Sequence, residues 1–358
     1  GNGNGNEIEN GTILKGTIAT DVTLSAGNTY KLSGEYIVEE GATLHIEEGV
    51  KIIAVYDDIA DYILVKQGGK INAVGTSDKP IVMTSEKEEP GAWGGIHICG
   101  RAHTNAEGGK GSSEIGGAVY GGNDDADNSG TLQYIRLEYT GFAFDEEHEA
   151  NGISFYGVGN GTIVDHCQAY KGSDDGFEFF GGSVNVSNLV AVSCSDDSFD
   201  WTEGWNGKGT NLVAYQEAES TLGYDCDCLM ECDNNGSNNA ATPVAHPVLK
   251  NLILVGNGGS KQGIRLRAGT EVEIDNAKVC GKGQPLTVET ALTENALKNG
   301  TSKLTNITLT SELSCKEGIY THADFIAVTS NKVDANLSYS SFEDIKKECS
   351  WMNGSWVK

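Results

Sequence analysis

The sequence predicts an all-β solenoid, in which one chain winds into stacked coils, and three observations support this fold class. The segment Ser173–Gly182 repeats as Ser195–Gly204, so that Asp175 and Asp197 lie 22 residues apart. Short β-type runs recur along most of the chain. Gly is abundant (48 residues) and Pro is scarce (5 residues), as tight corners between strands require. A repeat of about 20–29 residues built on a short strand is typical of a solenoid.

The N-terminal part of the chain, residues 12–90, alternates apolar and polar residues between Gly or charged breaks. Thr43–Ile46, Tyr62–Val65 and Lys70–Ala73 are examples of these short runs. Their apolar positions carry mostly Val, Ile and Leu, which suit parallel strands around a filled interior. Similar runs resume at Leu132–Tyr139 and continue to about residue 267.

Two segments interrupt the pattern and are expected to be loop excursions, near residues 101–130 and 218–247. Residues 286–300 carry apolar residues at helical spacing and predict one short helix. Residues 340–358 are expected to cap the open last coil, because solenoids need a capped end. The predicted organisation is therefore a flexible tether over residues 1–10 and one solenoid over residues 11–358.

The formal net charge is −26 and the pI is about 4.5. No basic surface suited to nucleic acid is expected, whereas solubility outside the cell and divalent cation binding are favoured. No run of 18 apolar residues is present, so no transmembrane span is predicted. The Gly- and Asn-rich start resembles the tether after the lipid-modified Cys of a bacterial surface lipoprotein. We therefore expect an exported monomer on the outer-membrane surface or outside the cell, with a lipid anchor.

Three of the nine Cys residues form a local cluster, Cys226, Cys228 and Cys232. The spacing fits no zinc pattern well, and a disulfide that clips this loop is the favoured interpretation. Cys167 and Cys194 are expected to be buried as small apolar side chains in stacked coils.

The period-2 alternation of strands assigns the side chains of the repeat to two faces. If Phe177 and Trp201 point into the solenoid, then Glu178 and Asp200 point outward. Arg265 lies between two apolar residues and is expected in the same outward column, a coil or two further on. Carboxylates about 5 Å apart suit either a bound Ca²⁺ ion or the catalytic pair of a retaining glycosidase.

Most of the chain resembles a group of bacterial secreted or surface proteins with the pectin-lyase-like fold. The resemblance is carried by Gly41–Ile52, Leu64–Thr76, Pro80–Ser85 and Trp93–Ile96, together with the repeated acidic segments. It implies a single-stranded right-handed parallel β-helix with two loop excursions. It is specific for the fold and says little about activity.

A local resemblance to polygalacturonases involves the acidic repeat. By analogy Asp175, Asp196 and Asp197 would be the acid, base and positioning carboxylates, and Arg265 would hold a uronate. The chain lacks the Gly-His-Gly of those enzymes and has Arg267 where they have Lys. Pectate lyases suggest another role for the same strip, in which Ca²⁺ bridges an acidic substrate and an Arg removes a proton.

The candidate ligand-binding side chains are Glu178, Asp200, Glu203, Trp205 and Arg267. Trp205 is expected in a loop beside the acidic repeat, where its ring could stack on a sugar. The candidate Ca²⁺ ligands are Asp174, Asp196, Asp124 and Asp127, the last two because closely spaced Asp and Asn oxygens followed by Gly can wrap Ca²⁺. A structural role for the Asp-Asp pairs, bonding to turn N–H groups, is equally open.

Three functions remain open from the sequence. The leading hypothesis is a cell-surface module that binds carbohydrate or another surface ligand, with Ca²⁺ as the one cofactor considered. The second is a polysaccharide hydrolase or lyase. The third is a structural spacer without a ligand.

Overall fold

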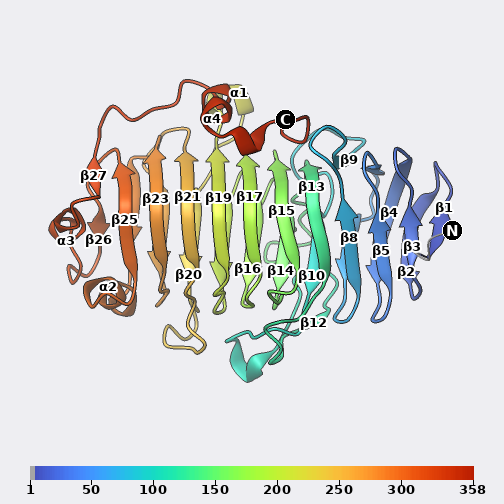
Figure 1. Ribbon diagram of the computed structural model, residues 1–358, viewed down its shortest axis with the longest axis horizontal. Coiled ribbons are helices and arrows are strands. Elements are labelled where there is room, and N and C mark those ends of the chain that lie inside the picture. The colour runs from blue at the N-terminus through green and yellow to red at the C-terminus, as the bar shows by residue number, and fades with distance from the viewer. Residues whose placement is uncertain (1–4) are drawn as a thin grey trace.

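Strands of successive coils pair in parallel along the length of the molecule, as the arrows of Figure 1 show. The structure is a computed structural model that describes residues 5–358. The N-terminal coils carry separate short strands: β1 (Asn6–Ile8), β2 (Ile13–Ile18), β3 (Val22–Leu24), β4 (Thr29–Val38), β5 (Thr43–Ile46), β6 (Lys51–Ala54), β7 (Tyr62–Val65), β8 (Lys70–Val74) and β9 (Ile81–Ser85). The predicted parallel β-helix is thereby confirmed.

From the middle of the chain onward the strands form two sets. The short strands make what we call the site ladder: β10 (Ile96–Cys99), β14 (Ile153–Tyr156), β16 (Phe177–Phe180), β18 (Phe199–Thr202), β20 (Met230–Asp233), β22 (Gln262–Arg267), β24 (Gln284–Val288) and β26 (Ser314–Cys315). The longer strands make the bent ladder: β13 (Gly130–Glu138), β15 (Ile163–Tyr170), β17 (Asn185–Val192), β19 (Lys208–Tyr215), β21 (Val248–Val255), β23 (Glu273–Cys280), β25 (Lys303–Leu309) and β27 (Lys332–Val333).

Most strands of the bent ladder turn a corner at one residue in the left-handed conformation. In β17, β19, β21 and β23 this residue is Asn, with φ between 57° and 62°, and Asn tolerates that conformation better than most residues. The four side chains form what we call the amide ladder. Asn276 donates to Asn251 (2.8 Å), Asn251 to Asn211 (3.1 Å), Asn211 to Asn188 (2.9 Å) and Asn188 to the Asp165 carboxylate (2.7 Å).

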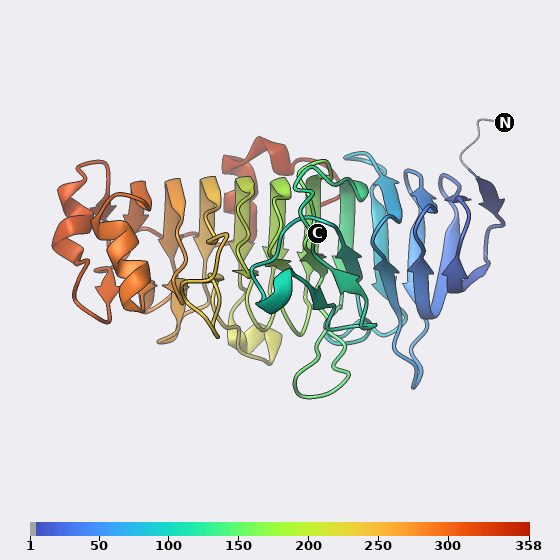
Figure 2. The same cartoon turned by 90° about the horizontal axis from the view of Figure 1, so that it is seen from below.

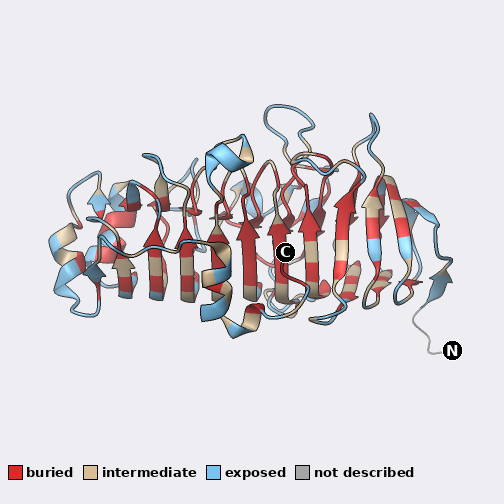
Figure 3. Cartoon of the chain, turned by 90° about the horizontal axis from the view of Figure 1, so that it is seen from above, coloured by how far each residue is buried: buried red, intermediate tan, exposed pale blue. Residues whose placement is uncertain are grey.

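Apolar and aromatic side chains stack inside the solenoid. The strands of the central coils are accordingly coloured mostly as buried in Figure 3. The rings of Phe177 and Phe199 lie 5.6 Å apart and nearly parallel, because β16 and β18 pair in register. Phe179 is held between Phe155 (5.0 Å) and Trp205 (4.0 Å). The inward positions expected for the repeat, Trp201 included, are therefore confirmed.

The first excursion leaves the coil after β10 and returns at β13, close to the limits expected. It contains the short 3-10 helix η1 (Glu107–Gly109) and a hairpin of β11 (Gly111–Ser112) and β12 (Val119–Tyr120). Ile115 and Tyr120 of this segment pack on outward apolar side chains of the site ladder, including Tyr156 and Phe180. Figures 1 and 2 show the excursion beside β10 and β14, on one side of the stack.

The second excursion differs from the expectation, because residues 218–247 are not one loop. Strand β20 lies inside this range and is a regular member of the site ladder. A loop with the single-turn helix α1 (Glu219–Leu222) precedes it, and another loop follows it. The helix expected within residues 286–300 forms as α2 (Ala291–Lys298), whereas β24 takes the residues before it.

Residues 334–358, which we call the strap, do not cover the end of the last coil. The strap contains α4 (Phe342–Glu348) and η2 (Ser350–Met352) and runs back along the outer face of the bent ladder (Figure 1). The buried side chains of Ile345, Met352 and Trp356 pack there, and the backbone N–H of Trp356 donates to the Ser77 carbonyl at 3.2 Å. Helix α3 (His322–Ala327) lies at the end of the stack instead, with Phe325 in the core.

Three further expectations can be compared with the structure. Residues 1–4 of the expected tether lie outside the described residues, while Asn6–Ile8 form β1 and pair with β3. The disulfide expected in the Cys226 loop is not formed, and the nine Cys of the described chain are all unpaired thiols. No helix within residues 5–358 has the length and apolar character needed to cross a membrane.

Candidate functional site

The outward column expected from the repeat is present on the site ladder. Glu178 of β16 pairs with Asp200 of β18, and Arg265 of β22 lies further along the same column. Glu231 of β20 lies between Asp200 and Arg265 in this column, and it was not predicted from the sequence. Its signal is weak because an inserted loop places Glu231 31 residues after Asp200, whereas Asp200 follows Glu178 by 22.

Each coil adds further charged side chains at the bend that precedes its site-ladder strand. Asp174 and Asp175 precede β16, Asp196 and Asp197 precede β18, and Asp227 precedes β20. The next coil is basic instead, with Lys261, Arg265 and Arg267. Three acidic coils and one basic coil therefore follow one another along the solenoid, at a parallel-strand spacing of about 4.8 Å.

Two of these carboxylates have the structural role that the sequence left open. Asp175 Oδ1 accepts the backbone N–H of Asp197 (2.9 Å), and Asp197 Oδ1 accepts that of Cys228 (3.1 Å). Asn151 does the same one coil earlier for the N–H of Asp175 (3.2 Å). One oxygen of each carboxylate thus ties its bend to the next coil.

The basic coil neutralises the carboxylates nearest to it. Arg265 pairs with Glu289 at 2.8 Å, and Arg267 pairs with Asp233 at 2.7 Å and with Glu231. The hydrogen bond that Arg265 donates to Glu289 raises the pKa of Arg265. Burial opposes the charge of Arg267, but the Asp233 and Glu231 carboxylates outweigh it and raise its pKa. Neither guanidinium is therefore suited to remove a proton from a substrate.

The remaining carboxylates of the first two acidic coils form no ion pair with a cationic side chain among residues 5–358. We call Asp174, Asp175, Asp196, Asp197 and Asp200 the carboxylate cluster. Asp174, Asp175 and Asp197 are buried, and Asp196 and Asp200 are half-buried. Burial, followed by the neighbouring Asp196 carboxylate, raises the pKa of Asp174 to about 9. Burial and the Asp200 carboxylate likewise raise the pKa of Asp175 well above its usual range. Like charges held this close favour either shared protons or a cation.

The oxygens of this cluster gather in two overlapping groups. Asp174, Asp175 and Asp196 can each place one oxygen within 4.8 Å of the others, and so can Asp175, Asp197 and Asp200. Asp175 belongs to both groups. An all-oxygen donor set with several carboxylates suits Ca²⁺, which takes 6–8 oxygen ligands at about 2.3–2.6 Å.

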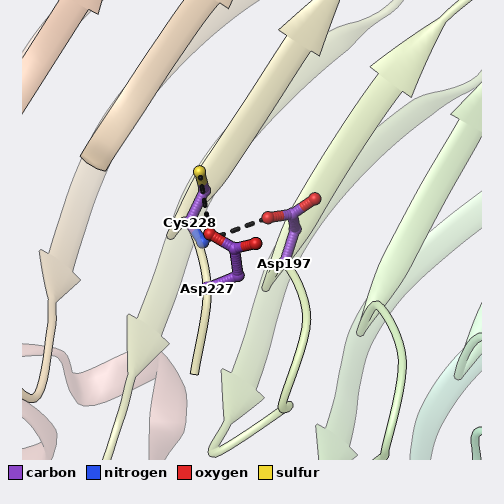
Figure 4. Close-up of side chains that lie close together, drawn as sticks. All are labelled: Asp197, Asp227 and Cys228. Atoms are coloured by element: carbon purple, nitrogen blue, oxygen red, sulfur yellow. Dashed lines mark hydrogen bonds between the residues drawn. The ribbon is translucent and has the colours of Figure 1, made fainter. Parts of the chain in front are cut away.

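A third group contains a thiol, and Figure 4 shows how its members converge from the bends before β18 and β20. Asp197, Asp227 and Cys228 also lie within 4.8 Å by their ligand atoms. The Cys228 thiol contacts the Asp227 carboxylate at 3.6 Å. Burial raises the pKa of this thiol far above its usual range, with the nearby Asp197 charge adding to the effect. A thiol that stays protonated is a poor metal ligand, so this group ranks below the two oxygen groups.

A cavity of about 450 Å³ adjoins the basic coil. Its walls include Asp233, Arg265 and Arg267 from β20 and β22, Glu289 after β24, and Lys316. The guanidinium groups are half-buried and retain N–H groups beyond those in the ion pairs. The cavity can therefore hold a polar ligand next to the acidic coils.

Four of the expected site residues, Trp205, Asp124, Asp127 and Glu203, lie away from the cluster or make structural hydrogen bonds instead. Trp205 is buried in the core, where its indole N–H donates to the Val184 carbonyl (3.0 Å), so it is not an accessible loop residue. Asp124 and Asp127 bond to N–H groups of their own loop, those of Ala126 (3.2 Å) and Arg101 (2.6 Å), and join none of the three groups.

Glu203 is occupied in holding the first excursion on the solenoid. Its carboxylate accepts hydrogen bonds from the Thr104 hydroxyl (2.6 Å) and the Tyr120 hydroxyl (2.8 Å). Glu114 of the same excursion was also missed, because nothing in its sequence context signals a site. Burial raises the pKa of Glu114 to about 7, and its charge acts on Asp174 and Glu178. The excursion therefore adds the charge of one more carboxyl group to the surroundings of the cluster.

Comparison with known proteins gives one match. No curated protein and no solved structure matches the chain at a significant level. Residues 16–358 match the family described as "Pectate-lyase like beta helix domain". This match covers nearly the whole solenoid, including the site ladder and the strap, and the chain therefore belongs to the pectate-lyase-like β-helix domain family.

Proposed function

We propose that this protein binds Ca²⁺ in the carboxylate cluster and uses the loaded site to hold an anionic glycan across the site ladder. The observation that carries the proposal is the pair of oxygen groups that share Asp175. They collect carboxylates that form no ion pair with an Arg or Lys side chain of the described residues. A divalent cation would supply the missing charge and return these groups to their ionised state.

The glycan part of the proposal is supported by what lies next to the cluster. The cavity of about 450 Å³ begins at the basic coil, and Arg265 and Arg267 face it from neighbouring positions of one strand. An acidic sugar chain laid along the solenoid axis would meet Ca²⁺ at β16 and β18 and guanidinium groups at β22. Guanidinium groups recognise carboxylates in a directed way.

The cation part is tested by calorimetric titration of the protein with CaCl₂ after treatment with EDTA. We expect saturable binding and a rise in melting temperature, because a ligand at 100 times its Kd adds about 2.7 kcal/mol to the free energy of unfolding. Asp175→Asn should abolish most of the binding, since Asp175 serves both oxygen groups. Asp58→Asn removes the same charge from an exposed turn and should bind Ca²⁺ as the parent does.

The glycan part is tested with polygalacturonate in the presence and absence of Ca²⁺. Retention of the protein on immobilised polygalacturonate with Ca²⁺, and its release by EDTA, would support the proposal. Absence of Ca²⁺ binding at millimolar concentration would contradict it. Chain scission that Asp197→Asn removes would favour the hydrolase or lyase alternative over a binding module.

We also propose that the protein is exported to the cell surface. This proposal rests on the resemblance of the sequence to bacterial surface proteins and on the acidic composition. Fractionation of the native cells, followed by protease treatment of intact cells, tests it. Recovery in the cytoplasmic fraction would contradict it.

A further inference from the structure

A second cavity, of about 280 Å³, lies between the strap and the bent ladder. Its floor is formed by Asn211, Asn251 and Asn276 of the amide ladder, and its wall by Trp351 and Glu348 of the strap. The carboxylate cluster lies on the site ladder, so the two sites occupy different faces of the solenoid. Neither the family match nor the proposed function involves this cavity.

The amide ladder leaves polar atoms free for a ligand. An Asn side chain offers two N–H donors and two acceptor lone pairs. Asn211 and Asn251 each use one donor and one acceptor within the ladder, and Asn276 uses one donor. One N–H and one lone pair therefore recur at each step, about 4.8 Å apart along the solenoid. That step is close to the length of one pyranose ring, and a donor beside an acceptor matches a pair of neighbouring hydroxyls.

The cavity also offers an aromatic ring and no net charge. Trp351 is half-buried, and its nearest aromatic neighbour is Trp356, at 6.4 Å between ring centroids. The charged groups of the lining, Lys278 and Glu348, form an ion pair with each other. In a chain of net charge −26, a neutral cavity with an indole and repeated amides is suited to an uncharged, polyhydroxylated ligand.

We propose that the cavity between the strap and the amide ladder binds a neutral oligosaccharide, with one sugar ring on Trp351 and its hydroxyls on Asn251 and Asn276. The site is independent of the carboxylate cluster and needs no cation. It lies partly on the strap, so it exists only while the strap is docked.

The test is titration of the EDTA-treated protein with cellotetraose, mannotetraose and maltotetraose, by calorimetry and saturation-transfer NMR. We expect at least one of them to bind at micromolar to millimolar concentration. Trp351→Ala should weaken this binding at least tenfold. Asn276→Gly should also weaken it, and Gly accepts the left-handed backbone at this position without strain.

Two variants serve as controls. Tyr56→Ala removes an exposed aromatic ring from another part of the surface and should leave the binding unchanged. Asp175→Asn should also leave it unchanged, which separates this site from the proposed Ca²⁺ site. Lack of binding by all three sugars, binding that neither Trp351→Ala nor Asn276→Gly weakens, or binding that requires Ca²⁺ would each overturn the proposal. Circular dichroism confirms that each variant is folded.

Discussion

At the scale of single residues, the unusual feature is a set of carboxyl groups that fold together although they repel one another. Asp175 is 3 % exposed and has Asp174, Asp197 and Asp200 around it. Burial of an isolated carboxylate costs desolvation free energy, which raises its pKa and favours either protonation or pairing with a cation. The hydrogen bond that Asp175 accepts from the backbone N–H of Asp197 offsets part of this cost. The protonation state of the cluster should therefore govern the stability of the cation-free protein.

The first prediction concerns pH. The pKa of Asp174 is about 9 in the folded chain and about 4 when unfolded, so the folded state binds more protons between these values. Stability in EDTA should fall as pH rises from 5 to 8, by up to about 1.4 kcal/mol per pH unit for each proton involved. Melting curves at several pH values measure this. The decline should shrink in Asp174→Asn and with added Ca²⁺. A melting temperature that rises over the same range would contradict the prediction.

The second prediction concerns His246, which bridges two carboxylates. Its ring nitrogens lie 2.9 Å from Glu271 and 2.8 Å from Glu273. Burial opposes protonation, but the hydrogen bonds to both carboxylates outweigh it and raise the pKa of His246. The two ion pairs of His246 therefore stabilise the fold fully below about pH 6.5, and this effect is lost as pH rises through the pKa of His246 in the folded state. His246→Gln should lower the melting temperature at pH 6 more than at pH 9. An equal loss at both pH values would contradict this account.

At the scale of elements, each coil is held to the next by aromatic stacking inside and by side-chain ladders at the bends. Phe179 shows the inner contribution, because it lies between the rings of Phe155 and Trp205 and is 2 % exposed. A stack of this kind fixes the register of neighbouring coils. Register in turn sets which carboxylates become neighbours on the outer face.

The third prediction tests that inner stack. Phe179→Ala should lower the free energy of unfolding by about 3–5 kcal/mol, because it leaves a cavity between two rings. Phe144→Ala, at a ring that is 40 % exposed in a loop, should have a much smaller effect. Chemical denaturation of both variants measures the difference. Equal losses in the two variants would contradict the prediction.

The fourth prediction concerns the first excursion. Glu203→Ala removes the acceptor for the Thr104 and Tyr120 hydroxyls. Hydrogen exchange should become faster within residues 101–122 and stay unchanged in β16 and β18, because local opening need not involve the core coils. Glu107→Ala, in an exposed part of the same excursion, is the matched control. Unchanged exchange in the excursion would show that apolar packing alone holds it.

The sequence predicted the elements best where coils repeat without interruption. Phe177 and Phe199 were placed correctly because a 22-residue step carries the first onto the second, and the same step carries Phe179 onto Trp201. Glu231 was missed because an inserted loop lengthens its coil and hides the step. Trp205 was misplaced because the Gly before it turns the chain back into the core, which no local pattern reveals. The role of Glu203 depends on a partner about 100 residues away, which periodicity cannot supply.

At the scale of the whole molecule, the strap makes coils that are distant along the axis depend on one another. In a solenoid each coil ordinarily contacts only its neighbours. Here Trp356 bonds to Ser77, while the rest of the strap packs on β17, β19 and β21. Lys358 adds an ion pair to Glu138 (3.2 Å). The strap should therefore increase the cooperativity of unfolding.

The fifth prediction tests this coupling. Trp356→Ala removes a fully buried indole and should release the strap, which makes residues 334–358 sensitive to protease before the solenoid is cut. The unfolding transition should also broaden, because the coils lose a shared partner. Lys347→Ala, which removes an exposed charge from α4, is the control. Resistance of the strap in Trp356→Ala would contradict the prediction.

The order of acidic and basic coils has a consequence for how such a protein can change. Because each coil adds one row of charges at a fixed step, the length of the acidic strip is a whole number of rows. Duplication of the 22-residue unit around β18 would lengthen the strip by one row and move the guanidinium groups one row further away. In a protein with more or fewer copies of this unit, the distance between the acidic and the basic groups would change by whole coils, and the site would suit a ligand with a different spacing between its charges.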